Sequence, residues 1–160
     1  MRYLFIIFTL YFSTAHAGNP VLATIGWIEP VRILPEAFDV QAKIDSGADN
    51  SSLDVLSIQS FMRDNKEWIR FEIRNNSDNT HILERPLKRY TLIKRKGTEP
   101  LKRPVVEMWL CIDKDKFLVP VNLAKRGNFK YRMLIGRSLL KGRFLVNPAL
   151  KMTSSPDCSN

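Results

Sequence analysis

Apolar and polar residues alternate along most of this chain, a pattern typical of strands with one face in a core and the other in solvent. Residues 38–44 show it most clearly, with apolar side chains at every second position. Further strands are expected at residues 23–28, 53–61, 68–73, 87–93, 105–112, 117–121 and 144–146. Prolines 30 and 35, glycines and polar runs such as residues 75–79 are expected to separate them.

One segment departs from this pattern. Residues 137–141 are expected to form a short helix that Gly142 ends, because glycine adopts the left-handed conformation of a C-terminal cap without strain. The chain has no internal repeat, linker or low-complexity stretch. We therefore expect one all-β domain over residues 18–160, with its core at about residues 25–150, carrying a single short C-terminal helix.

The first seventeen residues have the layout of a secretory signal peptide. Arg2 precedes an apolar run over residues 3–12, and Ala15 and Ala17 supply small residues for cleavage after position 17. The run is shorter than the roughly 20 residues that span a bilayer. The sequence thus predicts an exported, periplasmic protein without stable membrane insertion; an uncleaved membrane anchor is the alternative.

The net charge of +9 is unevenly distributed. Residues 85–103 hold eight basic side chains and one acid, Glu99, and residues 116–156 hold no acid at all. Such a balance favours anionic partners: acidic peptides, anionic polymers or membrane surfaces. Nucleic acid is disfavoured, because no recognised binding motif is present and export is expected.

Cysteine and histidine are scarce. Cys111 lies in an apolar run, where a buried free thiol is common, and Cys158 lies in a polar tail. The sequence favours unpaired thiols, with a disulfide in an oxidising compartment as the alternative. His81 is the one histidine after residue 17, so the chain lacks a recognisable zinc ligand set, and neither metal nor cofactor is expected.

The segment that bears most on chemistry is Asp45-Ser46-Gly47, which directly follows the strand at residues 38–44. Two such turns facing each other would form a carboxylate dyad that shares one proton, the general acid–base pair of aspartic proteases. Alone, the tripeptide is equally consistent with a turn in which Asp45 only accepts backbone hydrogen bonds. The chain contains one copy, so an enzyme would have to be a homodimer.

Two blocks of the sequence resemble the retropepsin-like aspartic proteases. They are residues 44–53 (Ile-Asp-Ser-Gly-Ala-Asp-Asn-Ser-Ser-Leu) and residues 134–140 (Leu-Ile-Gly-Arg-Ser-Leu-Leu). Gly26-Trp27, the Arg-Pro-Val-Val stretch at 103–106 and the ending up to Pro148 resemble a bacterial branch often labelled "ATP-dependent zinc protease". No zinc ligand set or ATP-binding glycine loop supports that label. The resemblance implies a small closed β-barrel.

The resemblance also implies roles for the turn residues. Asp45 of each subunit would activate the water that attacks the scissile carbonyl. Ser46, where the family more often has Thr, would hydrogen-bond across the dimer axis. Gly47 would allow close approach of the substrate backbone, and Ala48 would keep the neighbouring space small.

Two residues of the second block would support this loop. The resemblance implies that Gly136 lets the short helix pack closely against the loop. It further implies that Arg137 pairs with Asp49, four residues beyond the catalytic position.

A β-hairpin flap that closes over the substrate is the remaining feature that the resemblance implies. The best candidate is the turn at Gly97, between the strands at 87–93 and 105–112, with Lys94, Arg95 and Lys96 beside it. These cations would recruit acidic peptide segments, in line with the glutamate-tail trimming associated with some members of the branch; a simply solvated hairpin is the alternative.

Taken together, the sequence predicts an aspartic endopeptidase that acts on peptide or protein substrates, acidic ones included, through a dyad formed across a homodimer. The rival hypothesis is a non-catalytic exported binding module for anionic peptides or polymers, in which the second carboxylate is never supplied.

Overall fold

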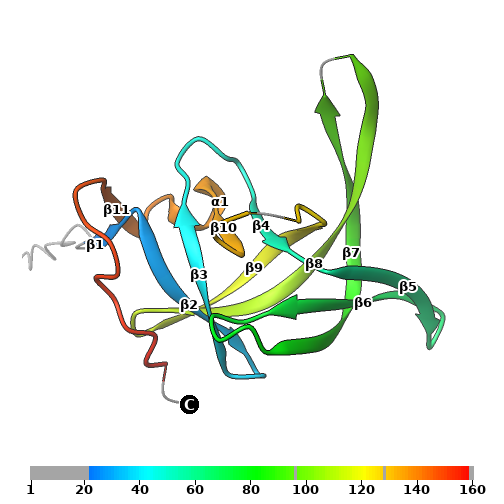
Figure 1. Cartoon of the computed structure of the whole chain (residues 1–160), viewed down its shortest axis with the longest axis horizontal. Helices are drawn as coiled ribbons and strands as arrows, with labels where there is room; N and C mark the ends of the chain where they lie inside the picture. Colours follow the sequence, from blue (N-terminus) through cyan, green and yellow to red (C-terminus); the bar gives the residue numbers. More distant parts are fainter. Residues whose placement is uncertain (1–21, 96, 128, 159–160) are drawn as a thin grey trace, which may run out of the picture.

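The computed structural model describes residues 22–95, 97–127 and 129–158; the expected signal peptide at 1–17 lies outside them. In this part of the chain the fold is nearly all β, with one short helix (Figure 1). In chain order the elements are β1 (Ala23–Gly26), β2 (Ile28–Leu34), β3 (Phe38–Ile44), β4 (Ser51–Asp54), β5 (Ser57–Arg63), β6 (Lys66–Arg74), β7 (Thr80–Arg95), β8 (Thr98–Ile112), β9 (Asp115–Ala124), β10 (Met133–Ile135), α1 (Arg137–Leu140) and β11 (Phe144–Asn147).

Six strands close into a barrel in the order β2-β3-β10-β4-β9-β8, and β2 pairs with β8 to complete the ring. Most neighbours are antiparallel, but β10 runs parallel to β3, and β4 runs parallel to β9. This confirms the expected small closed barrel with one short helix. Closure matters for the site, because it brings the C-terminal end of β3 beside β10 although about ninety residues separate them.

The barrel interior is filled by the apolar positions of the alternating pattern. In β3 the side chains of Val40 and Ala42 are fully buried, while their polar neighbours lie nearer the surface. Val31, Leu53 and Ile135 reach the same core from three other strands. Burying one such side chain contributes about 1.5–3 kcal/mol, so this shared core is what fixes the strand ends that carry the loops.

Outside the barrel, β7 continues the sheet from β8, followed by β6 and β5. The ends of β7 and β8 form a long hairpin that projects away from the barrel at the upper right of Figure 1. The hairpin turns at Gly97, whose φ of 77° is in the left-handed region that glycine tolerates.

Two strand predictions need correction. Pro30 does not break the first strand: it lies inside β2 and pairs with Gln41 of β3. It is tolerated because β8 pairs only with residues 32–34 of β2, so the missing N–H is not needed on that side. Residues 53–61 form two strands, β4 and β5, because the chain leaves the barrel after Asp54 and joins the outer sheet.

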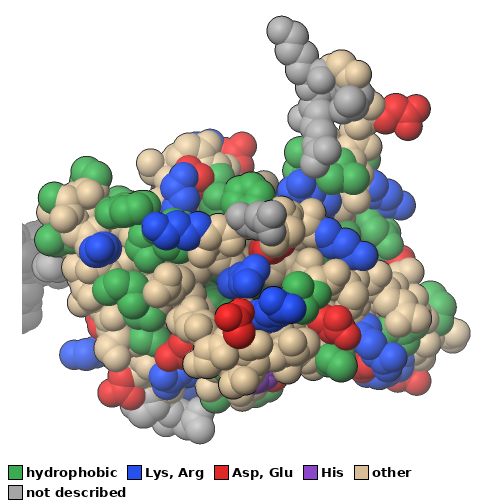
Figure 2. Space-filling model, viewed as in Figure 1, with side chains coloured by type: hydrophobic (Ala, Val, Ile, Leu, Met, Phe, Trp, Pro, Cys, Tyr) green, Lys and Arg blue, Asp and Glu red, His purple; other side chains and the backbone are tan. Residues whose placement is uncertain are grey.

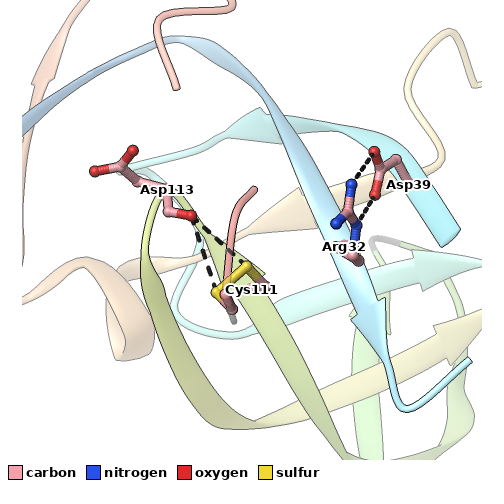
Figure 3. Close-up of a disulfide and its surroundings, with 5 residues drawn as sticks. Arg32, Asp39, Cys111 and Asp113 are labelled. Atoms are coloured by element: carbon pink, nitrogen blue, oxygen red, sulfur yellow. Dashed lines mark hydrogen bonds and ion pairs between the residues drawn. A yellow bond between two sulfur atoms is a disulfide. The ribbon is translucent and has the colours of Figure 1, made fainter. Parts of the chain in front are cut away.

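The C-terminal tail also departs from expectation, because Cys111 and Cys158 form a disulfide (Figure 3). The favoured prediction of unpaired thiols was therefore wrong. The tail follows the barrel closely, and Met152 N donates to Ile28 O at 2.7 Å while Asp157 N donates to Asp113 O at 2.8 Å. These contacts bring Cys158 to β8.

Glu29 clamps the same tail. Its carboxylate is fully buried and accepts hydrogen bonds from Gly26 N, from the N–H and hydroxyl of Thr153, and from those of Ser154. Burial raises the pKa of Glu29, but the hydrogen bonds outweigh burial, so the pKa lies below its ordinary value. Across the described residues, no helix is long and apolar enough to cross a membrane.

Candidate active site

The Asp45 loop begins where β3 leaves the barrel between β2 and β10. Ile44 N donates to Trp27 O, and Asp45 N donates to Ile135 O, both at 2.9 Å. The point at which β3 ends is thus held from both sides. The loop that follows, residues 45–50, is exposed or half-buried.

The loop presents the Asp45 carboxylate in a defined orientation. Gly47 N donates to Asp45 Oδ1 at 3.0 Å, and Ala48 N donates to Asp45 O at 3.2 Å. A quarter of the Asp45 side chain remains accessible, and its second oxygen, Oδ2, lies 3.7 Å from Lys43 Nζ. The carboxylate is therefore oriented by the backbone but still open to a ligand.

Arg137 holds the loop from the opposite side. Its Nη1 donates to the carbonyl oxygens of Ser46 at 2.8 Å and Gly47 at 2.9 Å, and its Nη2 pairs with Asp49. The contact between Arg137 and Asp49 that the resemblance implied is present. Because the planar guanidinium spans three acceptors, it holds two backbone carbonyls and one carboxylate in a fixed relation, which a lysine could not do.

Gly136 brings the start of α1 against the end of the loop. Its N–H donates to Ser51 Oγ at 3.2 Å, and a Cβ placed on it would lie 2.6 Å from the carbonyl carbon of Asn50. The next two backbone N–H groups donate to Ala48 O at 2.8 Å and Asp49 O at 3.0 Å. The close packing that the resemblance implied for Gly136 is therefore present in the structure.

The β7–β8 hairpin and the Asp45 loop extend toward the same side of the barrel in Figure 1. They meet at a small hollow, to which Asn50 contributes from the loop and Arg89, Thr91 and Ile93 contribute from β7. Figure 2 shows Lys and Arg side chains gathered at the base of this hairpin.

Only some of the residues expected to bind substrate at the hairpin tip lie among the described residues. Lys94 and Arg95 end β7, but their side chains are outside the described set, as is Lys96 altogether. Gly97 lies at the turn, as expected.

Sequence reasoning did not anticipate the position of Lys43 relative to the site. Residues at i and i+2 of a strand share a face. Because Lys43 stands two residues before Asp45, this spacing could have indicated that the two side chains lie on the same side. With Nζ 3.7 Å from Asp45 Oδ2, Lys43 brings a positive charge to the carboxylate.

Chemically, one chain presents a single oriented and accessible carboxylate at this loop. No hydrogen bond joins Asp45 to a second carboxylate among the described residues, and in that same part of the chain no cluster of three or more His, Cys, Asp or Glu is placed to hold a metal ion. A loop with one oriented, accessible carboxylate on a closed barrel, opposite a long hairpin, defines the retropepsin-like class of aspartic peptidase folds.

Comparison with known proteins gives the family. The sequence model of the RimB-like family, described as retropepsin-like aspartic endopeptidase RimB, matches residues 24–157. The chain belongs to this family.

Individual relatives carry a different name. Over 115 residues, or 70% of this chain, it is 31% identical to a probable alpha-L-glutamate ligase of Desulfotalea psychrophila, and over 112 residues it is 30% identical to one of Parasynechococcus marenigrum. The matches span only about a quarter of those ligases, 25% and 24% of their lengths.

A solved structure shares the fold. The crystal structure of Lpg0085, a DUF785 protein of unknown function from Legionella pneumophila, superposes with a TM-score of 0.73 at 25% identity. The match covers 83% of this chain and 98% of the Legionella chain.

Proposed function

We propose that this protein is an aspartic endopeptidase whose active site forms when the Asp45 loops of two copies meet. In that dimer the two carboxylates share one proton, and the ionised member removes a proton from the water that attacks the peptide carbonyl. The protonated member donates to the carbonyl oxygen as the tetrahedral intermediate forms. When the intermediate collapses, the C–N bond breaks and the carboxyl group that took the water's proton donates it to the leaving nitrogen. No cofactor is needed for these steps.

The observation that carries the proposal is the construction of the Asp45 loop. Three separate devices, the Gly47 N–H, the Arg137 guanidinium and the close approach of Gly136, hold a loop that packs against no core. A turn that merely connected two strands could contain the Gly47 N–H bond, but it would not need the Arg137 guanidinium or the close approach of Gly136. The loop leaves its carboxylate accessible, which favours a second copy of the same loop as its partner.

Acidic peptides are the substrate class that fits best. The net charge of +9 and the basic stretch at residues 85–103 favour anionic chains. The ligases that contain a matching segment are named for glutamate, which supports a substrate rich in that residue. Selection among acidic peptides then depends on the hairpin and the small hollow between it and the Asp45 loop.

Export is part of the proposal. The layout of residues 1–17 supports it, and so does the disulfide between Cys111 and Cys158, because disulfides persist in oxidising compartments such as the periplasm.

The test is product analysis by mass spectrometry. The full chain and its Asp45→Asn variant are incubated from pH 4 to 8 with a peptide library that includes acidic runs. Cleavage by the wild type alone supports the proposal. A monomeric protein that binds acidic peptides without cutting them would instead identify the chain as the non-catalytic binding module.

A further inference from the structure

The hollow between the Asp45 loop and the hairpin contains an unusual buried group, Asn122 of β9. Only 7% of Asn122 is exposed. Its Nδ2 donates to Ser51 O at 2.8 Å, so the amide cannot be turned over without losing that bond. The remaining atom, Oδ1, is buried and has no donor among the described residues. A buried acceptor without a donor is costly, which indicates that something else supplies one.

Arg89 lies at the same hollow and differs from its basic neighbours. Arg85 pairs with Glu36 at 2.7 Å, Lys88 pairs with Glu107, and Lys102 Nζ lies 3.8 Å from the centre of the Tyr90 ring. Arg89 is exposed and forms no ion pair with any described residue. Of these four cations it is therefore the one whose charge is left for a ligand.

The hairpin presents two different faces. Arg89, Thr91 and Ile93 alternate along β7 and line the hollow, whereas Tyr90 faces the other way, toward Glu67 and Lys102. A substitution of Arg89 on one face and a substitution of Lys102 on the other therefore remove the same charge from different surfaces.

We propose that Arg89 and Asn122 form a subsite that selects an acidic residue of the peptide substrate. Arg89 binds the side-chain carboxylate, and Asn122 Oδ1, which is covered in the free protein, accepts the backbone N–H of the same residue when the peptide enters the hollow. The ligand must therefore carry an anionic group and a hydrogen-bond donor together, as a glutamate or aspartate residue does. The inference rests on the proposed function in taking the Asp45 loop as the reaction centre.

Binding tests the subsite separately from cleavage. The full chain with Asp45→Asn is titrated with short peptides of otherwise uncharged residues. At each position in turn, one peptide carries glutamine and its matched partner carries glutamate, and Kd is measured for both. The same titration is repeated with Arg89→Gln, with Arg89→Lys, and with Lys102→Gln as the control that removes an equal charge from the opposite face. A further peptide replaces the amide of the best glutamate by an ester, which removes the N–H.

One position is expected to prefer glutamate over glutamine by about tenfold, the size of one hydrogen bond to a charged group. Arg89→Gln should abolish this preference, Arg89→Lys should retain part of it, and Lys102→Gln should leave it intact. The ester should bind several-fold more weakly than the amide.

The inference is overturned if no glutamate peptide binds, or if no position prefers glutamate over glutamine. It is also overturned if Arg89→Gln and Lys102→Gln reduce the glutamate preference equally. If the glutamate preference is found but the wild-type chain cleaves no peptide, the subsite is retained and the peptidase is rejected.

Discussion

The backbone of Gly136 packs directly against the backbone of Asn50, so closely that a Cβ on Gly136 would lie 2.6 Å from the Asn50 carbonyl carbon and 2.7 Å from its oxygen. The contact joins the start of α1 to the end of the Asp45 loop. It is made of backbone on the Asn50 side, so no side chain can turn away to relieve it.

Gly136→Ala should therefore displace the loop. We expect a loss of about 1–3 kcal/mol in the free energy of unfolding, as for other overpacked sites, and a larger proportional loss of kcat/KM because the loop carries Asp45. Urea unfolding and peptide cleavage measure the two effects. Ser138→Ala, at an exposed position two residues later, is the control. Unchanged activity in Gly136→Ala would contradict the account.

Arg137→Ala should reduce activity more than stability. The side chain is half exposed, so its ion pair with Asp49 adds little to folding, but it holds the Ser46 and Gly47 carbonyls in place. We expect kcat/KM to fall about tenfold or more, the size of one or two hydrogen bonds to a charged group. The dimer should also dissociate at higher protein concentration than the wild type.

The lysine variant serves as the control for charge. Arg137→Lys keeps the positive charge but cannot reach three acceptors at once, so it should recover only part of the activity. Full activity in Arg137→Lys would show that the guanidinium does not organise the loop. The same would follow if Arg137→Ala sedimented like the wild type at low protein concentration.

Glu29 should make stability depend on pH in the acid range. Its pKa is lower in the folded protein than in the unfolded chain, so the stability that it adds is fully present above about pH 4.3 and is lost as the pH falls through the folded value. Glu29→Gln should lose about 2 kcal/mol at pH 7, because its NH₂ group would face donors. Unfolding curves at pH 7 and pH 3 should show the gap between variant and wild type narrowing; a constant gap would contradict this.

The disulfide should stabilise the tail and the barrel together. It joins residues 47 positions apart, for which the chain-entropy estimate is about 4 kcal/mol. Cys158→Ser should lower the free energy of unfolding by an amount of that order. Dithiothreitol should bring the wild type to the variant's value and leave the variant unchanged. Equal sensitivity of both proteins to the reductant would indicate that the effect has another origin.

The strands and the Asp45 turn were largely predictable from the residues, because alternation marks strands wherever one face is buried, whereas the closed barrel was expected from the family resemblance. Residues 38–44 and the turn at Asp45 form one continuous local pattern. The break of residues 53–61 into β4 and β5 was not visible, since apolar residues recur throughout the stretch and only the barrel's closure separates the two strands.

Features that depend on contacts between residues far apart in the sequence could not be predicted from the local sequence pattern. Cys158 lies in a polar stretch, and only contacts made in the folded protein, such as those of the tail with Glu29, Ile28 and Asp113, show that this tail is held in place. Likewise, nothing in the sequence around Asn122 indicates that its Oδ1 is buried without a donor. Lys43 could have been found from the strand period alone.

The central claim is that two copies of Asp45 form one active site, and subunit mixing tests it most directly. Wild type and Asp45→Asn are mixed at a fixed total concentration, allowed to exchange, and assayed on a cleavable acidic peptide. If both carboxylates are required, activity follows the square of the wild-type fraction, so an equal mixture retains about one quarter of the full activity. Activity that falls in direct proportion, to about one half, would show that each chain acts alone and would contradict the account.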